Sequence, residues 1–363
     1  MNGQQGGVVR HLVVGAASHD AITNITVEAI DHGKISERSR IYSWFEPDES
    51  VTGLVRPIRE MPQGCSDDVL VYHLSYGIPG LTDVLLQRPE RLIIWYHNVT
   101  PAHFFESIDP EFADGLAHGR REIEILREKC HFAIADSTFN AEELIAAGYD
   151  DVVIARPLVT GSRFSGVGAD VAVLDKVWRR FPGGFILAVS QVLPHKRVDQ
   201  AVEALHLLRE YQSLDIGLVW VGPARQPKYM KAVRGLQYRL NQPNVEFMDV
   251  VSDGGLAALY RGCICFVSFS DHEGLSLPPL EAMANRAPVV VKASGAVPET
   301  VGRGAILLPH DTGVIEFSEV IGEVCRNGVL RSRMRIAGED HLRRLRGSDE
   351  FNRAVARIEK LAS

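Results

Sequence analysis

Two glutamates, Glu273 and Glu281, stand eight residues apart in the segment DHEGLSLPPLEAMANRAPVVV. Carboxylates on one helix face lie roughly three, four or seven residues apart, so this spacing indicates that the two meet across a loop and a helix start. Gly274 would let the backbone pass close to a ligand. The amides of Leu275 and Ser276 would approach the N-terminus of that helix, which favours an anion such as phosphate.

The segment suits one class of ligand. Two acceptors that flank an anion site match a molecule with hydroxyl groups on both sides of a diphosphate, as in a nucleoside diphosphate sugar. Spacing alone leaves a simpler interpretation open, in which Glu281 caps a helix and Glu273 is a surface residue.

A second segment, SQVLPHKRVDQAVEAL over 190–205, has a similar plan. A strand ends at Ser190, and a loop with His195, Lys196 and Arg197 precedes a helix. Fixed cations there could neutralise a leaving diphosphate, which gains charge in the transition state. The alternative is a solvated turn with a basic helix entry.

The surrounding elements predict an α/β protein with two doubly wound parallel sheets. Short, nearly all-apolar runs alternate with helical stretches, as expected for parallel strands that are buried on both faces. The predicted strands span 8–18, 40–45, 68–76, 91–97, 131–137 and 151–157, and then 184–190, 215–222, 244–250, 263–269, 287–293 and 305–309. The predicted helices span 110–130, 138–149, 198–210, 228–241, 253–261 and 278–285.

A Gly- and Ser-rich linker over 158–173 separates the two halves. We therefore expect an N-terminal domain over 1–165, a C-terminal domain over 166–345, and a last helix over 346–363 that crosses back to the first domain. The tail is rich in arginine, which is typical of a solvated helical face. A patch that docks on anionic lipid is the functional alternative. The arginines concerned are Arg326, Arg331, Arg333, Arg335, Arg343, Arg344 and Arg346.

Composition excludes several classes of protein. The 363 residues carry a net charge of −7, which argues against nucleic acid as a partner. No apolar run reaches the roughly 18 residues of a membrane span, and the start is a poor signal peptide, so we expect a cytoplasmic protein. Five cysteines, an odd number, argue against a disulfide framework. The G-x-G-x-x-G pattern of a dinucleotide-binding dehydrogenase does not follow the first strand.

Four motifs in order resemble the family-4 glycosyltransferases of the GT-B fold. EGLSLPPLEAMANRAPVV is similar to that family's nucleotide-sugar signature, in which a Glu, seven residues and a second Glu match Glu273 and Glu281. ILAVSQVLPHKRVDQAVEAL resembles its diphosphate-binding segment, with Lys196 as the lysine. The stretches over 245–263 and 295–308 resemble its base-binding stretch and its next loop and strand.

The resemblance implies roles for these residues. Glu281 would hold the ribose hydroxyls and Glu273 the hydroxyls of the donor sugar. Lys196, with the amides of Leu275 and Ser276, would hold the diphosphate. Many members carry an Arg five residues before that lysine, where this chain has Gln191. The resemblance therefore leaves His195 or Arg197 to supply the missing cation.

On the first half, WYHNVTPAHFFESIDPEF places His97 after a buried strand. By residue type alone it could be a core histidine, but the resemblance implies that it faces the donor sugar. The segment over 17–30 resembles the first loop of a subgroup, with His19 and Thr23 where glycines are usual. The acceptor-side candidates of this half are Asp20, Asn24 and His103.

The resemblance implies a retaining hexosyltransferase with two Rossmann-like domains that face across a cleft. Its donor would be a nucleoside diphosphate sugar of the GDP-mannose or UDP-hexose type, and its acceptor a glycan or a lipid-linked glycan. No metal and no cofactor are expected, because lysine and helix amides would do the work of Mg²⁺. The alternative is a catalytically weak protein of the same fold that binds a nucleotide sugar or scaffolds a pathway.

Overall fold

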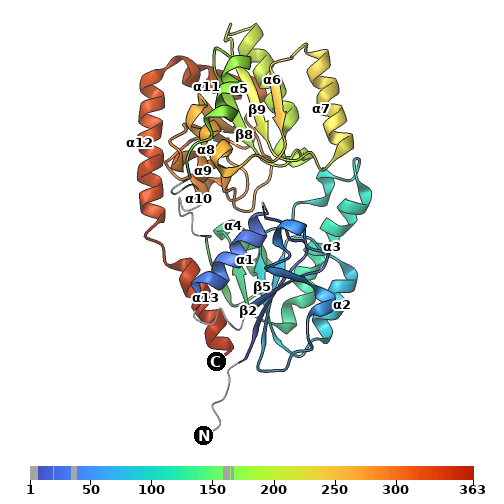
Figure 1. The fold of residues 1–363 in the computed structure, drawn as a ribbon. Coiled ribbons are helices and arrows are strands. Elements are labelled where there is room, and N and C mark those ends of the chain that lie inside the picture. Colours follow the sequence, from blue (N-terminus) through green and yellow to red (C-terminus); the bar gives the residue numbers. More distant parts are fainter. Residues whose placement is uncertain (1–6, 19, 34–38, 158–163, 165–166) are drawn as a thin grey trace. The chain divides into compact units, whose positions relative to one another are not determined.

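The computed structural model describes residues 7–18, 20–33, 39–157, 164 and 167–363. The chain divides into two compact units, which are residues 1–158 with 348–363 (unit 1) and residues 159–347 (unit 2). The domain boundary expected at residues 165 and 166 lies outside the described residues. Among the described residues, each unit is built on one parallel sheet with helices on both faces (Figure 1).

Unit 1 contains a seven-stranded parallel sheet in the order β3-β2-β1-β4-β5-β6-β7. Six of these strands lie where the apolar runs predicted them, and β3 was not predicted. The strands are β1 (Val9–Val13), β2 (Ser39–Ser43), β3 (Val55–Pro57), β4 (Val69–Leu74), β5 (Arg91–Tyr96), β6 (Cys130–Ala135) and β7 (Val152–Ile154). The central strands β4 and β5 are buried along almost their whole length, which explains their continuous apolar sequence.

The helices of unit 1 are α1 (Ala21–His32), α2 (Pro79–Gln87), α3 (Pro110–Leu126), α4 (Thr138–Ala146) and α13 (Glu350–Leu361). The expectation of a loop over 17–30 is wrong for residues 21–30, which form most of α1. Asp20 begins this helix, because its carboxylate accepts a hydrogen bond of 2.8 Å from the amide of Thr23. The N-capping signal was in the sequence, but the glycosyltransferase resemblance favoured a loop.

The last helix, α13, packs on unit 1 beside α1 (Figure 1). Its buried side chains Phe351, Val355 and Ile358 lie about one helical turn apart and join the core formed by β1, β4, β5 and β6. The Phe351 ring lies 5.7 Å from that of Trp95. Residues beyond unit 2 thus complete the core of unit 1.

Unit 2 contains a six-stranded parallel sheet in the order β10-β9-β8-β11-β12-β13. All six strands are near their predicted positions: β8 (Phe185–Val189), β9 (Gly217–Val221), β10 (Val245–Met248), β11 (Cys265–Ser268), β12 (Val289–Lys292) and β13 (Ile306–Leu308). The helices are α5 (Val171–Arg180), α6 (Val198–Glu210), α7 (Pro227–Arg239), α8 (Asp253–Gly262), α9 (Pro278–Ala284), α10 (Val297–Val301), α11 (Val314–Arg326) and α12 (Gly328–Leu345). Strands β8 and β11 pair at the centre, so the loops that follow them emerge side by side.

Candidate functional site

The two motifs of unit 2 meet at the carboxyl ends of β8 and β11. The Nζ of Lys196, from the loop after β8, donates to Oε1 of Glu273, from the loop after β11, at 2.7 Å. Their side chains are 16% and 11% exposed, so the ion pair is only partly screened by water. The structure therefore brings together two predicted site residues that lie 77 positions apart in sequence.

The loop that carries Glu273 is held by its neighbours. A Cβ at Gly295, whose φ is +54°, would lie 2.2 Å from the Glu273 carbonyl oxygen, so glycine is needed for this close approach. The amide of Ala296 donates to the same oxygen at 2.9 Å. The segment after β12 thus fixes the backbone of Glu273.

The same loop presents two amide groups. Ser276 has a φ of +69°, which is unusual for a residue other than glycine and turns the chain into α9. Among the described residues, neither Leu275 nor Ser276 donates its amide hydrogen to another protein group. Gly274 lies in the same turn and is half-buried. The amides of Leu275 and Ser276 are therefore suitable donors for an anion, as the sequence predicts.

Glu281 lies in the first turn of α9. Its carboxylate does not simply cap the helix, because Oε2 accepts a hydrogen bond from the Tyr260 hydroxyl at 3.0 Å. Tyr260 is a fully buried side chain of α8. The tyrosine thus fixes the position of one carboxylate oxygen.

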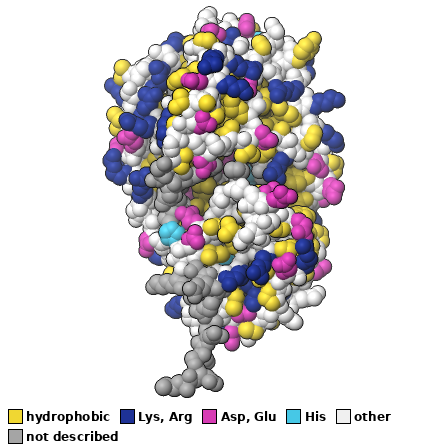
Figure 2. Space-filling model, in the orientation of Figure 1, with side chains coloured by type: hydrophobic (Ala, Val, Ile, Leu, Met, Phe, Trp, Pro, Cys, Tyr) yellow, Lys and Arg dark blue, Asp and Glu magenta, His cyan; other side chains and the backbone are white. Residues whose placement is uncertain are grey.

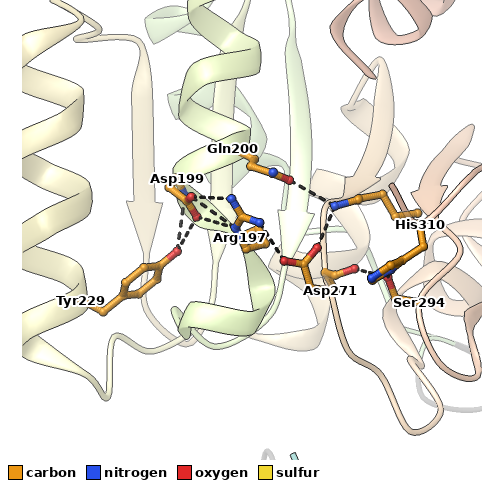
Figure 3. Close-up of polar contacts among 9 residues, drawn as sticks. Arg197, Asp199, Gln200, Tyr229, Asp271, Ser294 and His310 are labelled. Carbon is orange, nitrogen blue, oxygen red and sulfur yellow. Dashed lines mark hydrogen bonds and ion pairs between the residues drawn. The ribbon is translucent and has the colours of Figure 1, made fainter. Parts of the chain in front are cut away.

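An ion-pair network supports the loop of Lys196 (Figure 3). Arg197 has a left-handed backbone, with a φ of +53°, and its guanidinium donates to Asp271 at 2.7 Å and to Asp199 at 3.0 Å. Lys292 donates to the other oxygen of Asp271 at 2.7 Å. The Tyr229 hydroxyl donates to Asp199 at 2.8 Å. We call Arg197, Asp199, Asp271, Lys292 and Tyr229 the ion-pair network.

This network balances two cations with two carboxylates. Burial by itself would raise the pKa of Asp271, but hydrogen bonds from Lys292 and Arg197 hold that pKa below its usual value. Burial would lower the pKa of Arg197, and its bonds to Asp199 and Asp271 raise it instead. Asp271 and Arg197 therefore stay charged at neutral pH, and the ion pair between them joins the loops after β8 and β11.

The remaining donor-binding candidates differ in what they can supply. His195 is buried, and burial, then the charge of Lys196, hold its pKa well below the usual value, so it is neutral at pH 7. Arg197 is occupied by two carboxylates. Gln191 is exposed in the loop after β8. Among these residues, Lys196 is left as the cation nearest to the predicted diphosphate site.

In unit 1, His97 lies just after β5 with a side chain that is only 2% exposed. Its Nδ1 is 2.7 Å from Oδ2 of Asp136, and its Nε2 is 2.8 Å from Nδ1 of His73. Both ring nitrogens therefore have partners in unit 1. The predicted contact between His97 and a donor sugar stays a prediction.

The acceptor-side candidates lie on two segments of unit 1, the start of α1 and a short helix after β5. Asp20 caps α1 through Thr23, and Asn24 is exposed on the first turn of that helix. His103 is exposed in a short 3-10 helix over Ala102–Phe104. His19 lies outside the described residues.

The arginine-rich tail is bonded to unit 2 in several places. Arg331 donates to the carbonyls of Val324 and Cys325 at 2.7 and 2.6 Å, and Arg335 donates to the carbonyl of Arg286 at 3.1 Å. On the face shown in Figure 2, Lys and Arg side chains are interspersed with Asp and Glu. These contacts favour a structural role for the arginines over docking on a lipid surface.

The described residues bear on two further expectations, which concern a membrane contact and a bound metal ion. None of the helices described here has both the length and the apolar character to cross a membrane. In the same residues, no group of three or more His, Cys, Asp or Glu side chains is arranged to hold a metal ion. The cytoplasmic location and the metal-free reaction stay predictions.

Sequence reasoning missed three residues that support the predicted site. Asp271 opens the quoted Glu273 segment but was given no role, and Lys292 ends what was predicted as an apolar strand. Asp136 lies within the predicted strand over 131–137 and directly follows the observed strand β6 (Cys130–Ala135). A signal was available, since all three are charged residues at the carboxyl end of a parallel strand, where ligands bind in such sheets.

Comparison with known proteins gives a family match for part of the chain. Residues 181–341, which contain Lys196, Glu273 and Glu281, match the family described as "Glycosyl transferases group 1". Over these residues the chain is similar to the family-4 glycosyltransferases. The resemblance that the motifs carried is thereby confirmed.

Curated relatives of this chain include several proteins named as mannosyltransferases. It is 31% identical over 215 residues to the serotype-specific mannosyltransferase WbdA of Escherichia coli, which covers 56% of this chain and 25% of WbdA. It is 27% identical over 164 residues to a GDP-mannose-dependent phosphatidylinositol monomannoside mannosyltransferase of Corynebacterium glutamicum, which covers 42% of this chain and 41% of that protein. The chain spans about a quarter of the length of the WbdA proteins.

Solved structures show the fold. Anabaena Alr3699/HepE, solved in complex with UDP-glucose, matches with a TM-score of 0.75 at 14% identity and covers 97% of this chain and 99% of that one. The trehalose-6-phosphate synthase OtsA matches with a TM-score of 0.73 at 10% identity and covers 98% and 99% of the two chains. The chain therefore has the GT-B fold, as predicted.

Proposed function

We propose that this chain transfers a hexosyl unit from a nucleoside diphosphate sugar to an acceptor hydroxyl, with retention of configuration. One observation carries the proposal: the Lys196 ammonium, held by Glu273, lies in the loop next to the one that presents the amides of Leu275 and Ser276. A fixed cation and amide donors are what a leaving diphosphate requires.

The proposed reaction assigns each group a task. The bond between the anomeric carbon and the diphosphate oxygen breaks, and a bond from that carbon to the acceptor oxygen forms. Lys196 and the two amides stabilise the charge that the diphosphate gains. The proton of the acceptor hydroxyl goes to the leaving phosphate, and Glu281 accepts hydrogen bonds from the ribose hydroxyls.

GDP-mannose is the donor that we favour. Support comes from the relatives WbdA and the C. glutamicum enzyme, which are named as mannosyltransferases and, in the second case, as GDP-mannose-dependent. A UDP-hexose is the alternative, since HepE was solved with UDP-glucose. A polysaccharide end or a glycolipid precursor is the acceptor class that we propose, with the donor made available in the cytoplasm.

A second candidate is a catalytically weak protein that binds a nucleotide sugar. The charge of the predicted diphosphate site favours it. Arg197 is paired with two carboxylates, His195 is neutral, Gln191 carries no charge, and Lys196 already pairs with Glu273. Lys196 is therefore the one cation of these four residues that is not held by two carboxylates, and an incoming diphosphate must compete with Glu273 for it.

Thermal shift with GDP, UDP, GDP-mannose and UDP-glucose tests the binding part of the proposal. A ligand at 100 times its Kd stabilises a protein by about 2.7 kcal/mol, which gives a measurable shift. We expect one nucleotide class to raise the melting temperature and Glu281→Gln to weaken that effect, because a neutral amide is a poorer acceptor for two ribose hydroxyls.

Tyr260→Phe is the matched control for Glu281→Gln. It removes the 3.0 Å hydrogen bond to Glu281 but leaves the carboxylate in place. We expect it to bind the nucleotide more strongly than Glu281→Gln does. A transfer assay with the nucleotide sugar that binds then separates the two candidates, since binding without turnover favours the weak protein and no binding at millimolar nucleotide contradicts both.

A further inference from the structure

A chain of ring-to-ring hydrogen bonds crosses the sheet of unit 1. His11 Nδ1 is 3.0 Å from His73 Nε2, and His73 Nδ1 is 2.8 Å from His97 Nε2. His97 Nδ1 is 2.7 Å from Oδ2 of Asp136. We call His11, His73, His97 and Asp136 the histidine array. Its members come from β1, β4 and the ends of β5 and β6, which are neighbours in the sheet.

The array is buried. His11 and His73 are 3% and 0% exposed, and Asp136 is 2% exposed. The His73 and His97 rings are nearly parallel, with centroids 5.1 Å apart and an interplanar angle of 5°, as an in-plane hydrogen bond between two ring nitrogens requires. Burial lowers the pKa of His11 to about 4 and holds that of His73 well below its usual value, so these two rings are neutral at pH 7.

The bonds of the array all run in one direction. Each bond between two rings joins the Nδ1 of one ring to the Nε2 of the next. A neutral imidazole has one N–H and one acceptor nitrogen. A carboxylate accepts hydrogen bonds and does not donate, so a neutral His97 that bonds to Asp136 carries its proton on Nδ1. His97 Nε2 is then an acceptor, which requires Nδ1–H on His73, and the same argument requires Nδ1–H on His11.

We propose that Asp136 is a positioning residue that sets His73 and His97 in the Nδ1–H tautomer, so that His97 keeps Nε2 as a hydrogen-bond acceptor. The proposal rests on the proposed function and on the expectation, from the family resemblance, that His97 faces the donor sugar. With Nε2 as an acceptor, His97 could receive a hydrogen bond from a sugar hydroxyl, which would replace the one from His73. Asp136 itself acts only through His97.

A second group fixes the orientation of Asp136. The indole Nε1–H of Trp95, which can only donate, lies 2.8 Å from Oδ1 of Asp136. In Asp136→Asn this indole would hold the amide oxygen, and the amide NH₂ would then point at His97 Nδ1. His97 would have to accept there and carry its proton on Nε2. The isosteric variant should therefore reverse the tautomers along the array.

The test is the tautomer of His97, measured by long-range ¹H–¹⁵N NMR of protein labelled with ¹⁵N-histidine. The chain has 13 histidines, and His97→Gln and His73→Asn assign the two signals. We expect Nδ1–H on both rings in the wild type and Nε2–H on both in Asp136→Asn. Nε2–H on His97 in the wild type, or no reversal in a folded Asp136→Asn, would overturn the proposal.

Two further variants keep the test decisive. His11→Asn changes the far end of the array and should leave His97 as Nδ1–H, because the tautomer is set from Asp136. Trp95→Phe combined with Asp136→Asn frees the amide to turn and should restore Nδ1–H in part. A His11→Asn variant that reverses His97 would show that the far end sets the tautomer and would contradict the proposal.

Kinetics provide the readout for function. If the chain transfers a hexosyl unit, Asp136→Asn should lower kcat roughly tenfold with a smaller change in KM, because the variant exchanges an acceptor for a donor at His97. Should the wild type show no transfer, the proposed function fails while the NMR result still decides the tautomer. An unchanged kcat with reversed tautomers would separate His97 from the reaction.

Discussion

The two units place different chemistry at the same position of a parallel sheet. On its central strands, unit 1 has the histidine array, in which the carboxylate of Asp136 bonds to the first of three histidine rings that are linked by hydrogen bonds. Unit 2 has the ion-pair network, in which two cations balance two carboxylates. The stability of unit 1 should therefore change with pH near neutrality. The stability of unit 2 should depend on each charge of the network keeping its partner.

The largest effect should come from removing a charge from the ion-pair network. Asp271→Ala would leave Lys292, whose side chain is 3% exposed, without its carboxylate. Loss of one partner of a buried ion pair costs about 3–5 kcal/mol, because the other charge stays desolvated. We expect the free energy of unfolding of unit 2 to fall by about 3 kcal/mol, measured by urea denaturation with hydrogen exchange of β8 and β11.

Asp215→Ala is the matched control in the same unit. Asp215 also pairs with an arginine, Arg209, at 2.9 Å, but its side chain is 81% exposed. An exposed pair contributes about 0–1 kcal/mol. Equal losses in the two variants would show that burial does not distinguish the ion-pair network from an ordinary surface pair.

Acid should act on unit 1 through the histidine array. The pKa of His11 is lowered by burial to about 4, from 6.5. Between these values the unfolded chain binds a proton at His11 that the folded chain does not, so the free energy of unfolding falls as pH falls. Over the whole window this amounts to about 3 kcal/mol, and no further change is expected below pH 4. His73 contributes in the same direction.

The measurement is urea denaturation between pH 7.5 and 5, comparing the wild type with His11→Asn. The comparison is needed because Glu28, on α1, has the opposite effect. Burial and the charge of Asp31 raise the pKa of Glu28 to about 7, so its contribution improves as pH falls from 7 towards 4.5. Glu28 is present in both proteins and cancels. Parallel stability curves would contradict the assignment of acid sensitivity to His11.

The sequence predicted the sheets well because buried parallel strands need apolar residues at every position. The runs at β4, β5 and β8 are of this kind, and their positions were correct. β3 was missed because its residues, Val-Arg-Pro over Val55–Pro57, form no apolar run and end in proline. α1 was missed because the family resemblance outweighed the capping aspartate Asp20 and the periodic apolar residues behind it.

The site was predictable where a residue acts through its own type and position. Glu273 and Lys196 were selected from separate motifs, and they bond to each other. The occupation of Arg197 could not be predicted, because it depends on where Asp271 lies after the chain has folded. The histidine array likewise needs the strand order, which brings His11, His73 and His97 onto neighbouring strands.

The smallest effect compares two tyrosine hydroxyls, one in each unit. Tyr229 donates to the carboxylate of Asp199 at 2.8 Å, and Tyr149 donates to the carbonyl of Ile123 at 2.7 Å. A hydrogen bond to a charged group contributes about 1.5–3 kcal/mol, against about 0.5–1.5 kcal/mol for one between neutral groups. We expect Tyr229→Phe to cost more than Tyr149→Phe by about 1 kcal/mol, measured by urea denaturation at pH 7.

The two tyrosines make a fair pair because both are buried and both changes remove only a hydroxyl. The contrast between the two losses tests whether the carboxylate of Asp199 strengthens the bond from Tyr229. If the two losses are equal at pH 7, Asp199 interacts mainly with Arg197, and Tyr229 contributes no more than an ordinary hydrogen bond to the network.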